Sequence, residues 1–221
     1  MSVLSIHPVS FDVADTRIEG EIAVPEGAAG LVIFAHGAGS TRQSPGNRFL
    51  AETLEEAGLA VLLFDLLTPE ERAEEAETHQ YRFDIPLLTA RLRGALGWLD
   101  GQEEWNGLRL PLPIGLFGAS TGGTAALWAA AERPGRVRAV VGRSARTDLA
   151  LPILHQVKAP VLLLAGAWDQ PLVQMNREAV ERLPEARLET VEGATHLFPE
   201  PGALEQVAAK ARDWFLQCLT R

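Results

Sequence analysis

The chain has 221 residues, of which 47% are hydrophobic and 22% charged, with a formal net charge of −9 and a pI near 5.1. This length suffices for one sizeable domain with a buried core, and we expect residues 1–221 to form a single domain. An acidic chain without a basic stripe lacks the charge that nucleic-acid backbones and anionic membranes attract, so neither is an expected partner.

Three features of the sequence indicate the compartment in which the protein works. The segment Met1–Pro8 has neither a basic region nor a long apolar run, which argues against a secretory signal. No apolar run approaches the roughly 20 residues of a membrane-spanning helix. The single cysteine, Cys218, excludes an internal disulfide and lies in a helical pattern, which favours a packing role. A chain of this kind is typical of a reducing compartment, so we expect a cytoplasmic protein.

Short apolar runs alternate with helical patterns along the chain, after a leading pair of antiparallel strands at Val3–Val13 and Arg17–Val24. Further strands are expected at Leu31–Ala35, Ala60–Phe64, Ile114–Phe117, Val137–Val141, Val161–Ala165 and Leu188–Val191. Helices are expected at Arg48–Ala57, Ile85–Leu99, Thr121–Ala131, Leu172–Leu183 and Ala203–Leu219. Continuous apolar strands that alternate with helices predict an α/β protein with a mostly parallel, doubly wound sheet of about eight strands flanked by helices.

Two segments between these elements are less regular. Leu66–Arg82 is rich in glutamate and is expected to be a solvated loop or a short helix with an acidic face; a lid over the active site is the alternative. Gly142–Ala159 has room for one short helix, so no separate cap domain is expected.

The most informative motif is Gly118-Ala119-Ser120-Thr121-Gly122, a Gly-x-Ser-x-Gly sequence between an expected strand and an expected helix. In that context the motif is typical of a nucleophile elbow, a sharp turn that lifts the serine hydroxyl clear of the sheet. Gly118 and Gly122 flank the serine because side chains there would collide across the turn. The alternative is an ordinary glycine-rich turn, with phosphate bound at the helix N-terminus.

A serine hydroxyl is a weak nucleophile that needs a base beside it and an acid to orient that base. Asp169 and His196 each follow a later expected strand, and the chain order Ser120, Asp169, His196 is the order expected with this elbow. Other roles stay open: Asp169 as a helix cap, His196 as a loop-bracing residue, and Asp148 as the acid.

Backbone N–H groups must stabilise the oxyanion of a tetrahedral intermediate. We expect one from Thr121, which follows the nucleophile, and one from Ala38 in the loop His36-Gly37-Ala38-Gly39-Ser40. His36 itself is expected to stabilise this turn.

The chain resembles the α/β-hydrolases, and most of all their small, capless, dienelactone-hydrolase-like branch. The matching segments are His36–Arg48, Phe64–Thr68, Arg82–Pro86, Gly115–Gly122 and Gly193–Phe198, which are spread over nearly the whole chain. The resemblance implies an α/β-hydrolase fold and an esterase or lactonase that uses Ser120, Asp169 and His196. Dienelactone hydrolases typically carry cysteine as the nucleophile, whereas this chain has Ser120, which favours a general esterase.

Three arginines follow expected strands near the mouth of the site: Arg42, Arg143 and Arg146. They could hold a substrate carboxylate, or they could form surface or loop-bracing ion pairs. No Cys/His cluster or His-Glu-x-x-His pattern is present, so neither a metal nor an organic cofactor is expected.

These observations predict a serine esterase that cleaves carboxylic esters, with short or exposed acyl groups, through an acyl-enzyme. Its expected partner is a small-molecule ester or lactone. The alternatives are a lactone or dienelactone hydrolase; a thioesterase, peptidase or acyltransferase; and a non-enzymatic binding protein. The sequence does not predict the oligomeric state.

Overall fold

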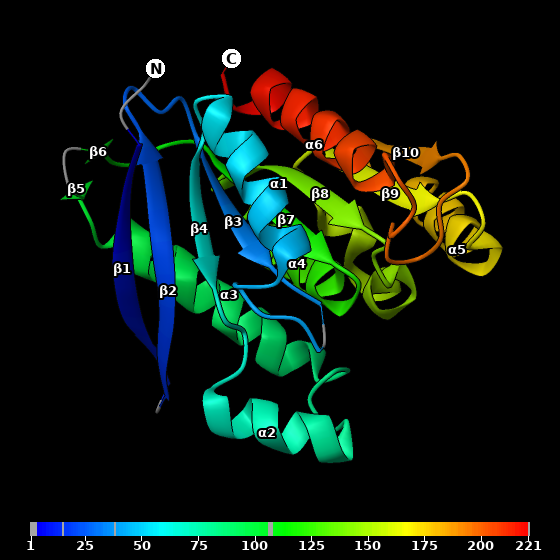
Figure 1. Ribbon diagram of the computed structural model, residues 1–221, viewed down its shortest axis with the longest axis horizontal. Helices are drawn as coiled ribbons and strands as arrows, with labels where there is room; N and C mark the ends of the chain where they lie inside the picture. The colour runs from blue at the N-terminus through cyan, green and yellow to red at the C-terminus, as the bar shows by residue number, and fades with distance from the viewer. Residues whose placement is uncertain (1–3, 15, 38, 106–107, 221) are drawn as a thin grey trace.

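The structure, a computed structural model, describes residues 4–14, 16–37, 39–105 and 108–220. A sheet of eight strands runs through it in the order β1-β2-β4-β3-β7-β8-β9-β10 (Figure 1). These strands are β1 (Leu4–Val13), β2 (Thr16–Pro25), β3 (Leu31–Ala35), β4 (Ala60–Phe64), β7 (Ile114–Ala119), β8 (Val137–Arg143), β9 (Val161–Gly166) and β10 (Ala186–Val191).

The sheet is mostly parallel. β1 pairs with β2 and β2 with β4 in antiparallel fashion, whereas the strands from β4 to β10 pair in parallel. The parallel strands therefore end at one edge of the sheet, where the loops that follow them meet and where ligands bind in sheets of this kind. The predicted mostly parallel sheet of about eight strands is confirmed.

Helices cover both faces of the sheet (Figure 1). On one face pack α1 (Pro45–Glu56) and α6 (Ala203–Leu219); on the other pack α3 (Ile85–Asp100), α4 (Thr121–Glu132), the 3₁₀ segment η1 (Thr147–Gln156) and α5 (Gln170–Val180). β3 shows why its sequence is continuously apolar. Val32 and Phe34 face α1 and α6, while Leu31 and Ile33 face the other layer.

The Leu66–Arg82 segment contains a helix, α2 (Pro69–Thr78), which is the short acidic helix that the sequence left open. Its start is a capping box: Thr68 Oγ1 accepts from the Glu71 N–H at 3.1 Å, and the Glu71 carboxylate accepts from the Thr68 N–H at 2.8 Å. α2 lies beyond the carboxyl end of β4 (Figure 1).

Two very short strands were not predicted: β5 (Glu104–Trp105) and β6 (Leu108–Arg109), which pair with each other. Two residues give no periodicity that a sequence pattern could show. The segment between β8 and β9 folds as η1, which agrees with the expected single short helix.

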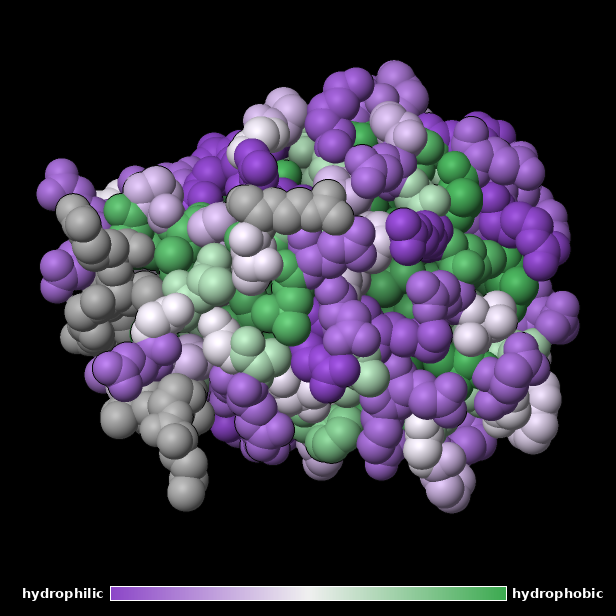
Figure 2. All heavy atoms as spheres, turned by 90° about the horizontal axis from the view of Figure 1, so that it is seen from above, coloured by the Kyte–Doolittle hydropathy of each residue, from purple (hydrophilic) through white to green (hydrophobic). Residues whose placement is uncertain are grey.

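Figure 2 shows the molecule from above, where hydrophilic residues predominate and hydrophobic patches lie between them. Of the helices in the described part of the chain, none is long and apolar enough to cross a membrane.

Candidate active site

Ser120 occupies a strained backbone position between the end of β7 and the start of α4. Its φ is 51° and its ψ is −119°, a conformation that a residue with a side chain rarely adopts. The two flanking glycines make the turn sterically feasible. A Cβ on Gly118 would lie 2.4 Å from Gly123 Cα, and one on Gly122 would lie 2.2 Å from the Ala35 carbonyl oxygen. The local backbone is therefore that of a nucleophile elbow.

Asp169 and His196 come together from the loops after β9 and β10. Asp169 Oδ2 lies 2.7 Å from His196 Nδ1. The two loops approach closely at Gly166, where a Cβ would lie 2.4 Å from the Ala194 carbonyl oxygen. Asp169 also caps α5, because its Oδ1 accepts from the Leu172 N–H at 3.4 Å. The capping role and the pairing with His196 therefore coexist.

Ser144 joins the elbow to the histidine loop, a role that the sequence did not reveal. Its φ is 48°, and its hydroxyl donates to the His196 carbonyl oxygen at 2.8 Å. On either side of it, the Ser120 N–H donates to the Arg143 carbonyl and the Arg146 N–H donates to the Ser120 carbonyl, at 2.9 and 3.2 Å. Residues 143–146 thus brace Ser120 and His196 against one another. A serine in a loop between strands carries no sequence signal for such a contact.

The site is open to water. The side chain of His196 is 40% exposed and that of Asp169 is 21% exposed. Among the described residues, the Ser120 hydroxyl makes no hydrogen bond with His196. In free enzymes, the hydrogen bond between a catalytic serine and its histidine is often long, and it tightens when substrate binds.

The expected oxyanion donors lie on two segments. Thr121 is the first residue of α4, where backbone N–H groups have no partner within the helix. Ala38 lies outside the described residues. Its neighbour Gly37 passes close to Ser120, because a Cβ on Gly37 would lie 3.4 Å from Ser120 Cβ. The loop after β3 therefore runs beside Ser120.

His36 holds two loops together and does not face Asp169. The Leu66 N–H donates to its Nε2 at 3.0 Å, so Nδ1 carries the proton and donates to the Gly37 carbonyl at 3.0 Å. Burial is the largest influence on the pKa of His36 and lowers it; Asp65, 3.7 Å from Nε2, opposes this shift without overcoming it. The neutral ring agrees with the turn-stabilising role expected from the sequence.

Two of the three candidate arginines are already paired with carboxylates. Arg42 forms an ion pair with Asp65, and its backbone N–H donates to the same carboxylate at 2.9 Å. Arg146 binds both oxygens of Asp148, at 2.9 and 2.7 Å. The hydrogen bond from Arg146 lowers the pKa of Asp148. The carboxylate of Asp148, the alternative candidate for the acid, is therefore already bound to Arg146. These pairs match the loop-bracing interpretation.

Arg143 differs from the other two arginines. Burial lowers the pKa of its guanidinium, and no carboxylate of the described residues forms an ion pair with it. Its Nη1 lies 3.8 Å from where a Cβ on Gly46 would stand, at the start of α1. The described part of the chain also contains no group of three or more His, Cys, Asp or Glu side chains that could hold a metal ion.

An eight-stranded, mostly parallel sheet with a strained serine after a central strand and a His–Asp pair after later strands defines the α/β-hydrolase class. The chain belongs to the alpha/beta hydrolase domain family, whose model matches residues 28–211.

Similar solved structures agree with this family assignment. The chain is 49% identical to a dienelactone hydrolase from Anabaena variabilis, with a TM-score of 0.92 over 98% of this chain and 99% of that chain. It also superimposes on Est1E from Butyrivibrio proteoclasticus with a TM-score of 0.79, over 97% of this chain and 99% of that one. That identity is 15%, so the second match shows the fold alone. The predicted fold and the resemblance to dienelactone hydrolases are confirmed.

A curated relative from Mycobacterium tuberculosis is 50% identical over 203 residues and carries the provisional name of a phosphoribosyl transferase. The match covers 91% of this chain and 44% of the relative. The chain therefore spans less than half the length of that relative, and the name describes a much longer protein.

Proposed function

We propose that the protein is a serine esterase that cleaves small carboxylic esters through an acyl-enzyme. The observation that carries the proposal is the pairing of His196 Nδ1 with Asp169 Oδ2 at 2.7 Å, in the same molecule as a strained serine elbow. The 49% identity to a dienelactone hydrolase supports hydrolysis of an ester or a lactone.

In the proposed mechanism, His196 takes the proton of the Ser120 hydroxyl through Nε2 while the serine oxygen attacks the ester carbonyl. Asp169 holds the proton on Nδ1 and stabilises the imidazolium that forms. The carbonyl oxygen becomes an oxyanion that the N–H groups of Thr121 and Ala38 stabilise.

The tetrahedral intermediate then collapses. The bond to the leaving alcohol breaks as His196 gives the alcohol its proton, and the acyl group remains on Ser120. His196 next takes a proton from water, the hydroxide attacks the acyl carbon, and the acid is released as the proton returns to Ser120.

The remaining substrate contact in this proposal is Arg143. It is the candidate arginine without an ion-paired carboxylate among the described residues, and it ends β8, on the β9 side of Ser120, so it is the one free to hold a carboxylate on the alcohol part of the substrate. A preference for acidic over neutral esters that persists in Arg143→Gln would remove Arg143 from the substrate site.

The transferase name of the Mycobacterium tuberculosis relative does not extend to this chain. It describes a protein of which the match covers 44%. The Asp169–His196 pair and the strained turn at Ser120 instead support acyl transfer to water, which needs an acid, a base and a nucleophile.

Labelling with a fluorophosphonate tests the proposal directly, because the probe reacts with an activated serine. We expect the wild-type protein to be labelled and Ser120→Ala to be unlabelled with an unchanged melting temperature. Ser10→Ala, on β1 and away from the site, is the matched control and should still be labelled. A well-folded wild-type protein that resists labelling would overturn the esterase assignment.

A panel of ester, lactone, thioester and peptide substrates then separates the chemical classes. We expect aryl and aliphatic esters of small acids to be the best substrates, with hydrolysis lost in Ser120→Ala. A higher kcat/KM for lactones would favour the lactonase alternative.

A further inference from the structure

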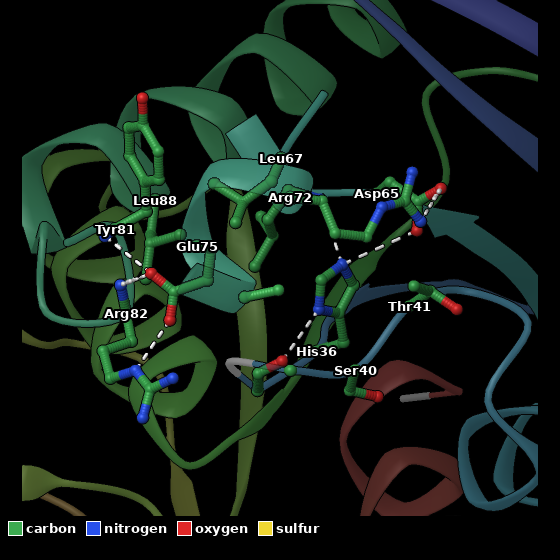
Figure 3. A pocket seen from close by; sticks show the side chains of 14 residues that line it. His36, Ser40, Thr41, Asp65, Leu67, Arg72, Glu75, Tyr81, Arg82 and Leu88 are labelled. Atoms are coloured by element: carbon green, nitrogen blue, oxygen red, sulfur yellow. Dashed lines mark hydrogen bonds and ion pairs between the residues drawn. The ribbon is translucent and has the colours of Figure 1, made fainter. Parts of the chain in front are cut away.

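A cavity of about 160 Å³ lies beneath α2, beyond the carboxyl ends of β3 and β4. Its walls come from the loop after β3, the loop after β4, α2 and the first turn of α3. Figure 3 shows Leu67, Tyr81 and Leu88 among the side chains around it, with His36 at one side. Its lining surface is largely apolar, including Leu66 and Ala76.

The roof of the cavity is held in place by buried charges. Glu75 on α2 has a side chain only 3% exposed, and its carboxylate accepts from the Tyr81 N–H, the Arg82 N–H and Arg82 Nε, at 2.8, 3.1 and 2.6 Å. Glu71 on the same helix pairs with Arg91 of α3 at 2.7 Å. α2 is therefore held against α3 by Glu71 and against the loop that follows it by Glu75, and the cavity exists before any ligand binds.

The sheet order shows which end of an ester would reach this cavity. His196 and Asp169 follow β10 and β9, on one flank of Ser120, while the cavity lies after β3 and β4, on the other flank. The leaving alcohol must lie next to His196 to receive its proton. The acyl group then points away from His196, toward β3 and β4.

Gly37 connects the cavity to the nucleophile. It lines the cavity, and a Cβ placed on it would lie 3.4 Å from Ser120 Cβ. An acyl group attached to Ser120 therefore leaves the reacting carbon beside a segment that also forms the cavity wall.

The volume and charge of the cavity limit the acyl group. A buried apolar cavity of about 150 Å³ accommodates a benzene ring, so about 160 Å³ suits groups from butyryl to benzoyl. The charged side chains that line it pair with one another, Arg82 with Glu75 at 2.6 Å and Arg72 with Asp65 at 3.9 Å. Nothing in this arrangement favours a charged acyl group.

We infer that this cavity is the acyl-binding pocket of the proposed esterase, and that it selects compact, uncharged acyl groups of about four to seven carbons. The inference rests on the proposed function. Ala76 is a specificity-determining position, because it lines the cavity from an exposed site on α2 where a larger side chain can be introduced without disturbing the core.

Ala76→Phe tests the inference, with Ala73→Phe as the matched control. Ala73 is an exposed alanine on the same helix that does not line the cavity. The measurement is kcat/KM for 4-nitrophenyl acetate, butyrate, hexanoate and benzoate, with melting temperatures for all variants. Filling the pocket should lower kcat/KM for benzoate and hexanoate by at least about tenfold, the size of effect that a few methylenes have in an apolar pocket. Acetate should change less than about threefold.

The reverse change is Leu67→Ala, which enlarges the cavity at a buried wall residue. It should raise the ratio of hexanoate to butyrate hydrolysis. An Ala76→Phe profile that matches Ala73→Phe, in protein that is active and labelled by fluorophosphonate, would overturn the acyl pocket alone. Absence of labelling and of all ester hydrolysis would instead overturn the proposed function.

Discussion

His36 joins the loops after β3 and β4, and this joint depends on a neutral imidazole. Its Nε2 must accept from the Leu66 N–H, which it cannot do when protonated. The charged neighbours act in opposite directions on the pKa of His36: Asp65 raises it and Arg72 lowers it, while burial, the largest influence, lowers it. The loop beside Ser120 is therefore tied to the protonation state of a residue outside the proposed triad.

The sign of the resulting pH dependence follows from linkage. In the folded protein the pKa of His36 lies below its ordinary 6.5, so the unfolded chain binds this proton first as the pH falls. The free energy of unfolding is thus unaffected by this group above pH 6.5 and decreases as the pH falls toward the lower, folded pKa, by at most about 1.4 kcal/mol per pH unit.

We predict that His36→Gln flattens this dependence. The variant should be less stable than wild type at pH 7, because it alters a buried hydrogen-bonded joint, yet lose less stability between pH 6.5 and 5. Urea unfolding at several pH values measures both quantities. If the free energy of unfolding changed with pH equally in wild type and variant, the result would contradict a buried, neutral His36.

At the scale of an element, two glycines of α3 have opposite surroundings. A Cβ on Gly94 would lie 2.2 Å from Cγ2 of Val13 on β1, whereas one on Gly97 would meet nothing within 4 Å. Valine is branched at Cβ and has little freedom to move its methyl groups aside. The close contact of α3 with β1 therefore depends on the missing side chain at Gly94.

We predict that Gly97→Ala raises the free energy of unfolding by roughly 0.5–1 kcal/mol, the gain in helix propensity. Gly94→Ala should lower it by about 1–3 kcal/mol, because the steric conflict outweighs the same gain. Thermal or urea unfolding of both variants provides the comparison, and each variant is the control for the other. Equal stabilisation by both substitutions would mean that α3 does not pack closely on β1.

The elements that the sequence predicted best are those with strong, local hydrophobic patterns. β3, β4 and α6 begin and end where predicted, at Leu31–Ala35, Ala60–Phe64 and Ala203–Leu219. α2 had a readable start signal in Thr68-Pro69-Glu70-Glu71, but its polar surface gives no apolar stripe. Its place depends on long-range pairs such as Glu71 with Arg91, which no local pattern encodes.

In the candidate site, too, some residues could be predicted from local sequence patterns and others could not. Ser120, Asp169 and His196 could be proposed from the sequence because a motif and the ends of strands mark them. Ser144 and Glu75 could not, because their importance lies in contacts with residues 52 and 7 positions away in the chain. The sequence did not distinguish among the three arginines, because the partner of each one depends on how the loops fold.

At the scale of the whole molecule, the strand order places the two halves of the proposed ester substrate on opposite sides of Ser120. The cavity after β3 and β4 lies on one flank of Ser120, and the loops after β9 and β10 lie on the other. The second flank carries two exposed hydrophobic residues next to the His–Asp pair: Trp168 is 67% exposed and Leu197 is 71% exposed. In the proposed esterase, the acyl and alcohol groups therefore contact different elements of the fold.

This separation predicts independent control of the two specificities. Trp168→Ala should lower kcat/KM for esters of bulky alcohols, such as naphthyl esters, and leave the acyl-chain profile unchanged. Ala76→Phe should lower kcat/KM for bulky acyl groups and leave the preference among alcohols unchanged. In the double variant the two losses should add within about 0.5 kcal/mol, as for distant sites without shared partners. A cycle of kcat/KM values for naphthyl acetate, naphthyl benzoate and their ethyl counterparts measures the coupling. Coupling above about 1 kcal/mol would mean that both residues contact the same part of the substrate, and that the sheet does not divide the ester at Ser120.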